Sequence, residues 1–182
     1  GCRHVDLAAS LYDAISPVEH GAGVLAEIVI ESAPLPVATA ADAVYLDGVQ
    51  DPGNVGTLLR TAAAAGVRHV AAAPGTSFLW APKVLRAAMG AHFVLKLYED
   101  VRPEQLAAAF LGERLSADVH AAESIYSTDW GTQPTVWLFG SEGQGLSAAA
   151  EAVAQRRLRI PVDASVESLN VAAAAAVCLF EA

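Results

Sequence analysis

The sequence predicts an α/β fold in which a mostly parallel sheet carries helices on both faces. From Ala43 to the end of the chain, short apolar runs alternate with helix-like segments, and this alternation is typical of parallel sheets. Proline near the start of several helix-like segments, and glycine just past the end of others, mark their boundaries. At 182 residues, the chain is long enough for one domain with a full hydrophobic core and a short appendage.

The expected elements follow one another in alternating order. The apolar runs predict strands at Ala43–Leu46, Arg68–Ala73, His92–Leu97, Leu115–His120, Thr135–Phe139 and Leu158–Val162. The segments between them predict helices at Val55–Ala65, Pro82–Met89, Pro103–Leu111, Ser147–Gln155 and Leu169–Glu181.

The first part of the chain has a different composition. A helical pattern at Val5–Ile15 and a strand pattern at Val24–Ile30 precede a linker, Ser32–Ala41, that is rich in proline and alanine. The chain starts with Gly1 and shows no signal-peptide pattern, so we expect that a preceding segment has been removed.

Composition argues against several classes of protein. No apolar stretch is long enough to cross a bilayer, which predicts a protein without a membrane partner. Cys2 and Cys178 lie at opposite ends of the chain and the five histidines are scattered, so we expect neither a disulfide nor a metal site. This cysteine usage fits a reduced, cytoplasmic location.

The net charge of -9 is unfavourable for binding to phosphate groups. Two local clusters of basic residues could still attract RNA: Lys83 with Arg86, and Arg156, Arg157 and Arg159. Compensation of a helix dipole explains the arginine trio equally well.

One polar loop follows the first apolar run. The stretch Gln50–Arg60 opens a helix, and ligands in open α/β sheets bind at such strand-to-helix turns. Asn54 is a good N-cap for a helix that begins at Val55, and Arg60 is expected to reach back toward it, because helical side chains tilt toward the N-terminus. Taken singly, a capping asparagine and a solvated arginine would also explain this pattern.

Two further loops occur at matching places downstream. The apolar run Val136–Phe139 leads into a loop with three glycines, Gly140–Gly145, that carries Glu142. The run Leu158–Val162 leads through residues 163–167 to Ser168, Leu169, Asn170 and an alanine-rich helix.

Together the three stretches, in this order, resemble the three sequence motifs of the SpoU/TrmH family of RNA ribose 2'-O-methyltransferases in the SPOUT superfamily. The resemblance covers roughly residues 43–182 and includes Pro82–Ala91. It implies a catalytic domain at 43–182 in which the last helix is tucked through a preceding loop as a deep trefoil knot. It also implies that residues 1–33 are the end of a ribosomal-protein-like RNA-binding domain plus a linker, with His20–Ala26 as its final strand.

The resemblance implies S-adenosylmethionine as cofactor, RNA as substrate, with rRNA favoured over tRNA, and a homodimer. The catalytic residues that it implies are Arg60, Asn54, Glu142, Ser168 and Asn170. The cofactor-binding residues that it implies are Leu138, Phe139, Gly140, Glu142, Gly145, Ile160, Val162, Ser168 and Leu169. By side chain alone Leu138, Ile160 and Leu169 also suit plain core packing, which leaves their backbone free to bind.

Two roles are open for Arg60. The family's arginine is usually taken as the general base, but a guanidinium is effectively always protonated. Arg60 would then instead stabilise the developing alkoxide of the ribose hydroxyl, positioned by Asn54 and Glu142.

Two alternative functions were weighed against the sequence. A nucleotide-binding oxidoreductase is disfavoured because Gly140, Gly143 and Gly145 have the wrong spacing for G-x-G-x-x-G. A non-catalytic RNA-binding or ribosome-assembly factor with the same fold suits the acidic charge. The presence of Arg60, Asn54, Glu142 and Asn170 together argues against it.

Overall fold

The computed structural model describes residues 3–16, 18, 21–30 and 33–182, and divides the chain into two compact units, Gly1–Glu31 and Ser32–Ala182. In the first unit, helix α1 spans Ala9–Ile15 and none of the described residues is buried. Parts of the predicted N-terminal remnant, residues 1–2, 17, 19–20 and 31–32, lie outside the described residues. No helix in the described ranges is long and apolar enough to cross a membrane.

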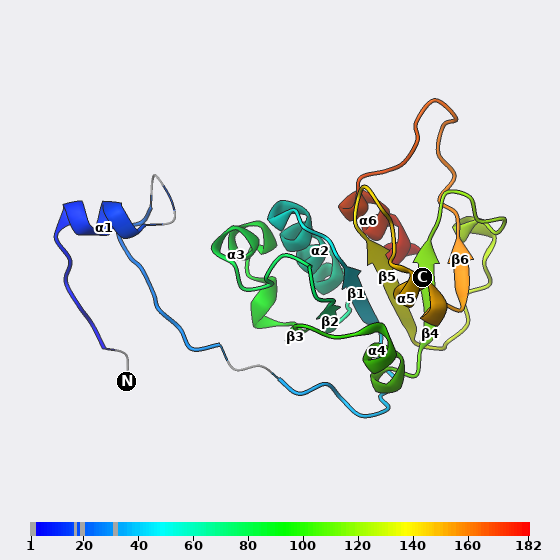
Figure 1. The fold of residues 1–182 in the computed structure, drawn as a ribbon, viewed down its shortest axis with the longest axis horizontal. Helices are drawn as coiled ribbons and strands as arrows, with labels where there is room; N and C mark the ends of the chain where they lie inside the picture. Colours follow the sequence, from blue (N-terminus) through cyan, green and yellow to red (C-terminus); the bar gives the residue numbers. More distant parts are fainter. Residues whose placement is uncertain (1–2, 17, 19–20, 31–32) are drawn as a thin grey trace. The chain divides into compact units, whose positions relative to one another are not determined.

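The second unit is built on a six-stranded sheet in which every pair of neighbouring strands is parallel (Figure 1). Its strands are β1 (Ala43–Asp47), β2 (His69–Ala72), β3 (Lys96–Tyr98), β4 (Glu113–Ala117), β5 (Thr135–Gly140) and β6 (Arg156–Leu158). Its helices are α2 (Pro52–Ala64), α3 (Pro82–Ala88), α4 (Pro103–Ala109), α5 (Ala148–Val153) and α6 (Val171–Glu181), with short 3₁₀ turns η1 (Ala91–Phe93) and η2 (Ile125–Ser127). The predicted α/β class with a parallel sheet is confirmed, and the trefoil knot stays a prediction of the resemblance.

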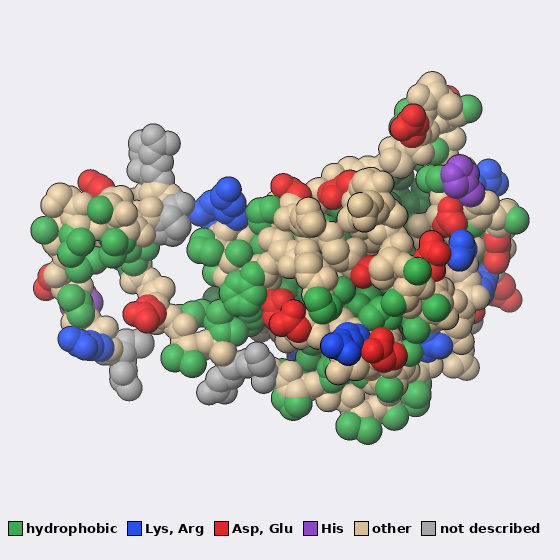
Figure 2. All heavy atoms as spheres, viewed as in Figure 1, with side chains coloured by type: hydrophobic (Ala, Val, Ile, Leu, Met, Phe, Trp, Pro, Cys, Tyr) green, Lys and Arg blue, Asp and Glu red, His purple; other side chains and the backbone are tan. Residues whose placement is uncertain are grey.

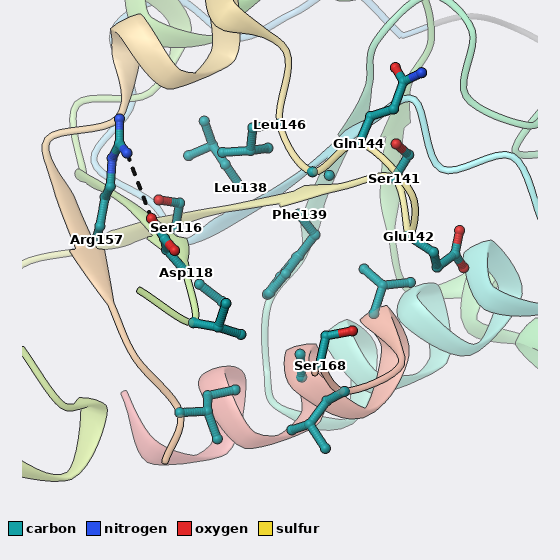
Figure 3. Close-up of a pocket in the computed structure, with 18 of the residues that line it drawn as sticks. Ser116, Asp118, Leu138, Phe139, Ser141, Glu142, Gln144, Leu146, Arg157 and Ser168 are labelled. Carbon is teal, nitrogen blue, oxygen red and sulfur yellow. Dashed lines mark ion pairs between the residues drawn. The ribbon is translucent and has the colours of Figure 1, made fainter. Parts of the chain in front are cut away.

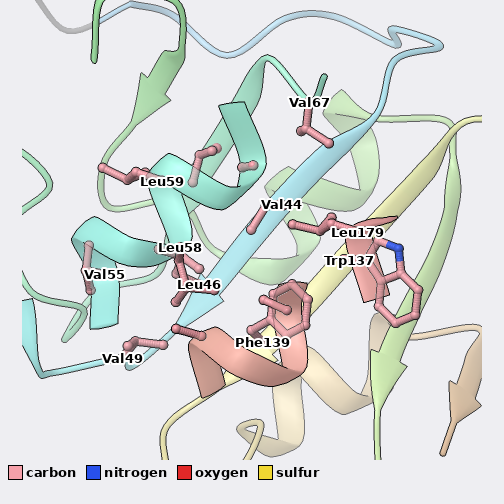
Figure 4. Close-up of a cluster of buried hydrophobic side chains, with 14 of the residues drawn as sticks. Val44, Leu46, Val49, Val55, Leu58, Leu59, Val67, Trp137, Phe139 and Leu179 are labelled. Atoms are coloured by element: carbon pink, nitrogen blue, oxygen red, sulfur yellow. The ribbon is translucent and has the colours of Figure 1, made fainter. Parts of the chain in front are cut away.

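Helices cover both faces of this sheet, as predicted. Alternate residues of β1 point to opposite sides: Val44 and Leu46 pack in a core with α2, α3 and α6, whereas Tyr45 packs in a second core with α4 and α5. Figure 4 shows the first core, where Leu58 of α2 and Leu179 of α6 lie against the β1 and β5 side chains. Helices therefore shield both faces of β1 from water, which explains why the whole strand is buried and why its residues are apolar up to Asp47.

The strand order β3-β2-β1-β5-β4-β6 creates a switch point between β1 and β5. From β1 the chain continues through α2 on one face, and from β5 it continues through α5 on the other. The two strands pair from Ala43 with Val136 to Asp47 with Gly140, so their carboxyl ends lie side by side. Ligands of open α/β sheets bind in the crevice outside such a point.

Three predicted strands of the second unit differ from the structure by more than one residue at an end. The strand expected at His92–Leu97 is wrong in its first half, because Met89 and Gly90 adopt positive φ angles of 49° and 88° and turn the chain into η1. The strand expected at Leu115–His120 is instead β4, which ends at Ala117, because Asp118 Oδ1 accepts a hydrogen bond from the His120 N–H at 2.8 Å and forms a turn.

The strand expected at Leu158–Val162 is also wrong in its bounds. β6 begins at Arg156 and ends at Leu158, and Pro161 just beyond it has no N–H to continue a ladder. Arg156 and Arg157 therefore lie on a strand, and the helix-dipole interpretation of these two arginines is wrong. Arg156 pairs with Glu113 at 3.2 Å and with Glu123, whose pKa it lowers by hydrogen bonding.

Three predicted helix starts are wrong by more than one residue. α1 begins at Ala9, four residues later than the predicted Val5. α2 begins at Pro52, and its N-cap is Asp51, whose carboxylate accepts a hydrogen bond from the Asn54 N–H at 2.8 Å. Asn54 is thus inside the first turn and is not the cap. α6 begins at Val171 with Asn170 as its cap, two residues later than predicted.

The strand predicted at Val24–Ile30 is wrong. These seven residues form no strand, and their side chains are exposed, including Val24 at 76% and Val29 at 90%. A β-branched pattern favours a strand only where a neighbouring strand supplies hydrogen bonds, and the described residues of this unit supply none.

Candidate active site

A cavity of about 560 Å³ opens at the carboxyl ends of β4, β5 and β6. Its volume lies in the range of small-molecule sites. Loop residues that follow β5 and β6 form much of its wall, and the first residues of α6 close one side. In Figure 3, Phe139 and Leu138 come from β5, Ser168 lies just before α6, and Glu142 and Arg157 lie on opposite sides of the hollow.

The loop after β5 is folded back on itself. The Ser141 N–H donates to the Gly145 carbonyl at 3.0 Å, and the Gly145 N–H donates to the Ser141 carbonyl at 2.9 Å. A Cβ on Gly140 would lie 2.1 Å from the Gly145 carbonyl carbon, so only glycine allows this approach. The result is a narrow turn of backbone at the cavity wall, which we call the glycine cradle. The chain then reaches Ser147, the N-cap of α5. The Ser147 N–H donates a hydrogen bond to the buried Asp47 carboxylate at 2.6 Å.

Three polar side chains from the three motifs meet beside this cradle. The Asn54 side-chain amide donates to the Glu142 carboxylate, and the Asn54 Oδ1 accepts from the Asn170 amide at 3.0 Å. The Asn170 Oδ1 in turn accepts from the Ala172 and Ala173 N–H groups at 3.0 and 3.3 Å. The orientation of each amide is thereby fixed, and the loops after β1 and β5 are tied to the start of α6.

The segment before Ser168 has a local turn of its own. The Asp163 carboxylate accepts hydrogen bonds from both the hydroxyl and the N–H of Ser165, at 2.5 and 2.9 Å, and these bonds lower the Asp163 pKa. Ser168 and Leu169 follow this turn and line the cavity.

The structure brings all nine of the predicted cofactor-binding residues to the wall of this one cavity. They are Leu138, Phe139, Gly140, Glu142, Gly145, Ile160, Val162, Ser168 and Leu169. Leu138 and Phe139 are almost fully buried, so their side chains belong to the two cores as well as lining the cavity. Of the predicted catalytic residues, Glu142 and Ser168 line the cavity, and Asn54 and Asn170 contact Glu142 directly or through one residue.

Arg60 does not join this group. Its side chain is exposed and forms no hydrogen bond or ion pair with any described residue. Since α2 begins at Pro52, Arg60 is six helical residues beyond Asn54, which turns it about 120° around the axis. It lies one turn beyond Gly56, on the side of α2 where Gly56 contacts α3.

A charged group at the other end of the cavity was not predicted from the sequence. Asp118, after β4, pairs with Arg157 of β6 at 3.6 Å, and Arg157 also pairs with Glu151 of α5 at 3.7 Å. All three line the cavity, together with Ser116 and His120. Figure 3 shows the Asp118–Arg157 pair next to Ser116. Asp118 lies within a predicted strand and Arg157 just before another, but only the strand order puts β6 beside β4.

Among the described residues, no group of three or more histidine, cysteine, aspartate or glutamate side chains could hold a metal ion. The ionisable side chains that line the cavity are those of Glu142, His120 and the Asp118–Arg157–Glu151 group.

Comparison with known proteins agrees with this geometry. Residues 42–180 match the family model of the SpoU rRNA Methylase family. The chain is 41% identical over 140 residues to an uncharacterized tRNA/rRNA methyltransferase from Synechocystis, covering 75% of this chain and 51% of that protein. It is 39% identical over 140 residues to the 23S rRNA (guanosine-2'-O-)-methyltransferase RlmB of Bordetella pertussis, covering 75% and 56%.

Solved structures agree as well. The SpoU methyltransferase AviRb of Streptomyces viridochromogenes, in complex with AdoMet, superposes with a TM-score of 0.72 at 30% identity, covering 81% of this chain and 58% of that one. An AdoMet-bound rRNA methyltransferase from Sinorhizobium meliloti gives a TM-score of 0.73 at 30% identity, covering 83% and 60%.

A parallel sheet with this switch point and these three loops defines a SPOUT-type methyltransferase domain. The chain belongs to the SpoU rRNA Methylase family. It spans about half the length of the curated relatives that it matches.

Proposed function

We propose that this chain is the catalytic domain of an RNA 2'-O-methyltransferase that transfers a methyl group from S-adenosylmethionine to a ribose hydroxyl. The observation that carries the proposal is the meeting of the three motif loops at the mouth of one cavity, where Asn54 joins Glu142 to Asn170. The AdoMet-bound structures of two proteins with the same fold support it.

The cavity fits S-adenosylmethionine in size and in chemistry. The Gly140–Gly145 cradle presents backbone N–H and carbonyl groups where an adenine could bind, and Leu138, Ile160 and Leu169 supply apolar contacts. When bound there, the cofactor supplies an electrophilic methyl group. Leu138, Phe139 and the start of α6 exclude water from one side of the cavity.

The residues around the cavity mouth position the ribose hydroxyl and stabilise the charge that develops on it. Asn54 and Asn170 hold the Glu142 carboxylate in one position, at the edge where a ribose hydroxyl would arrive. Arg60, exposed and always protonated, stabilises the negative charge that develops on that hydroxyl oxygen as its proton leaves to water or to a nearby phosphate. Ser168 is placed to contact the substrate or the cofactor from the α6 side.

The substrate is RNA, and ribosomal RNA is favoured over transfer RNA. The family model and the similarity to a 23S rRNA methyltransferase support this choice. A cytoplasmic location is compatible with such a substrate and with the cysteine usage. With a net charge of -9, the chain relies on local basic residues, so a longer form that carries a preceding RNA-binding domain should bind RNA more tightly and with a steeper salt dependence.

The proposed assembly is a homodimer. α6 offers an alanine-rich helix whose exposed Phe180 has 65% of its surface free, a suitable contact for a second copy with C2 symmetry. Light scattering at micromolar concentration should give about twice the chain mass of 18.8 kDa, and a monomer mass would contradict the dimer.

The decisive experiment replaces Arg60 with alanine and with lysine. We expect Arg60→Ala to lower the methylation rate about a hundredfold or more, and Arg60→Lys not to restore it, because an ammonium cannot reproduce the guanidinium fork. Affinity for S-adenosylmethionine, measured by calorimetry, should stay unchanged because Arg60 does not line the cavity. Arg102→Gln, an exposed arginine at the start of α4, is the control.

The same measurements test the non-catalytic alternative. A wild-type chain that binds RNA but transfers no methyl group, with no cofactor binding at millimolar concentration, would support an RNA-binding or assembly factor. An Arg60→Ala rate within a few-fold of wild type would show that the catalytic assignment of this residue is wrong.

A further inference from the structure

An apolar surface next to α2, the helix that carries Arg60, is left uncovered in the second unit. Around α3 and η1, five large hydrophobic side chains are exposed, and we call this group the α3 surface. It comprises Phe78 at 52% exposure, Leu85 at 37%, Met89 at 72%, Phe93 at 94% and Val94 at 53%. In Figure 2, hydrophobic side chains gather over the α3 region, with a basic side chain next to them. Contiguous exposed patches of this kind mark interaction sites.

The backbone holds Phe93 in this exposed position. Met89 and Gly90 turn the chain with positive φ angles, and the following η1 directs His92 inward while its neighbour Phe93 points out. The His92 Nε2 bonds to the Leu79 carbonyl at 2.8 Å, and the His92 ring packs against Trp80 with centroids 4.9 Å apart. The η1 turn is therefore anchored from inside, and an aromatic face is presented to solvent.

Basic side chains border the α3 surface. Lys83 and Arg86 are three residues apart on α3 and both are exposed, as are Leu85 on the same helix and Met89 at its C-cap. Arg60 lies on the side of α2 that faces α3, since a Cβ on Gly56, one turn earlier, would touch Ala87 and the Val84 carbonyl. Exposed aromatic and basic groups thus run from η1 along α3 to the candidate catalytic arginine.

We propose that the α3 surface, with Lys83, Arg86 and Arg60, binds an unpaired stretch of the substrate RNA next to the nucleotide to be methylated; this inference rests on the proposed function. Bases stack on exposed aromatic rings, and basic side chains track the phosphates, which is the usual chemistry of single-stranded RNA binding. Paired RNA hides the faces of its bases and cannot use Phe93 and Phe78 in this way.

Charge favours RNA over a second copy of the chain as the occupant. In a chain with 20 acidic and 11 basic residues, Lys83 and Arg86 border this apolar patch on the α3 side, which complements a polyanion. The acidic group next to it, Glu99, is half-buried and accepts a hydrogen bond from the Leu79 N–H. A symmetric contact between two α3 surfaces would instead bring the Lys83 and Arg86 side chains of both copies close together.

The test compares two variants of the α3 surface with two matched controls. Phe93→Ala removes the most exposed ring and Lys83→Gln removes one charge. Tyr126→Ala removes an exposed ring on η2, at the β6 edge of the sheet, and Arg102→Gln removes an exposed charge at the start of α4, on the opposite face. The probe is a fluorescein-labelled single-stranded RNA of about 12 nucleotides, together with the same sequence as a blunt duplex.

We expect Phe93→Ala to weaken binding of the single strand about fivefold or more, with little change for the duplex. Lys83→Gln should lower the slope of log affinity against log salt by about 0.7. Both controls should bind like wild type. Equal affinities for Phe93→Ala and Tyr126→Ala, or a wild type that does not bind the single strand at low salt, would overturn the proposal.

Two further readouts separate this inference from others. Light scattering of Phe93→Ala should give the wild-type mass; a change in mass would show that the surface joins copies of the chain and would overturn RNA binding here. Calorimetry with S-adenosylmethionine should give wild-type affinity for every variant. If the wild-type chain binds RNA but not the cofactor, the proposed function is wrong. The RNA affinities of Phe93→Ala and Lys83→Gln would still decide whether the α3 surface binds RNA.

Discussion

Asn170 donates its side-chain amide to the Oδ1 of Asn54 over 3.0 Å, although 116 positions separate the two residues in the chain. The same Asn170 caps α6 through its Oδ1, so one side chain both starts a helix and fixes the partner of Glu142. Capping and site geometry are therefore coupled at this residue.

Two substitutions of Asn170 should separate these two roles. Asn170→Asp keeps a capping oxygen but loses the N–H donor to Asn54, so we expect near-wild-type stability with a reduced methylation rate. Asn170→Ala loses both and should also lower the free energy of unfolding by about 0.5–2 kcal/mol. Urea unfolding and methylation assays on the pair check this. Equal losses of stability in both variants would contradict the cap.

The glycine cradle gives a second prediction. Gly140→Ala would place its Cβ 2.1 Å from the Gly145 carbonyl carbon, so the loop must open, with a loss of about 1–3 kcal/mol in stability and weaker binding of S-adenosylmethionine. Gly143→Ala is the matched control for stability, because a Cβ there meets nothing within 4 Å. Thermal unfolding of both variants and calorimetry on Gly140→Ala test the prediction, and similar Tm values for the two would contradict it.

The sequence predicts the architecture well because the architecture depends on a repeated signal. Each apolar run is followed by a helix with recognisable punctuation, so the parallel sheet and the common edge of the three loops could be inferred before any contact was known. The nine residues expected at the cofactor site share one cavity for the same reason: they sit at the ends of neighbouring parallel strands.

Element boundaries depend on choices that local sequence leaves open. Asp51 and Asn54 are both good N-caps, as are Ser168 and Asn170, and tertiary contacts decide between them. The Asn54 side chain forms hydrogen bonds with Glu142 and Asn170, and Asp51 is the residue that caps α2. The Asp118–Arg157 pair could not be predicted, because it requires β6 to lie beside β4, which is a long-range pairing.

The buried thiol of Cys178 gives a third prediction. Cys178 lies fully buried in α6, and desolvation raises its pKa to about 12. Because the thiolate is the reactive form, we expect no modification by iodoacetamide in the folded protein and rapid modification in urea. The experiment uses a Cys2→Ser background so that only Cys178 is measured. Native-state labelling as fast as in urea would show that α6 is not packed as described.

The last prediction concerns His69, on β2 at the opposite side of β1 from the candidate site. Its Nδ1 lies 2.9 Å from the Tyr98 hydroxyl and its ring packs edge-on against Phe110, so burial, with a smaller contribution from Lys96, lowers its pKa below 6.5. The unfolded chain then binds this proton more readily than the folded one. The stabilisation by neutral His69 is complete above pH 6.5 and is lost as the pH falls from 6.5 toward the lower pKa of the folded state.

His69→Gln should remove that pH dependence. Between about pH 7.5 and about pH 5.5, on either side of the ordinary histidine value, the free energy of unfolding should fall more for wild type than for His69→Gln. The half-buried carboxyl of Glu99, whose pKa desolvation raises, titrates in both proteins and cancels in the difference. Urea unfolding at the two pH values measures it, with His4→Gln, an exposed histidine in the first unit, as the control that should behave like wild type. If the decrease in stability is the same for wild type and His69→Gln, the pKa of His69 is not lower in the folded state than in the unfolded chain, and the prediction is wrong.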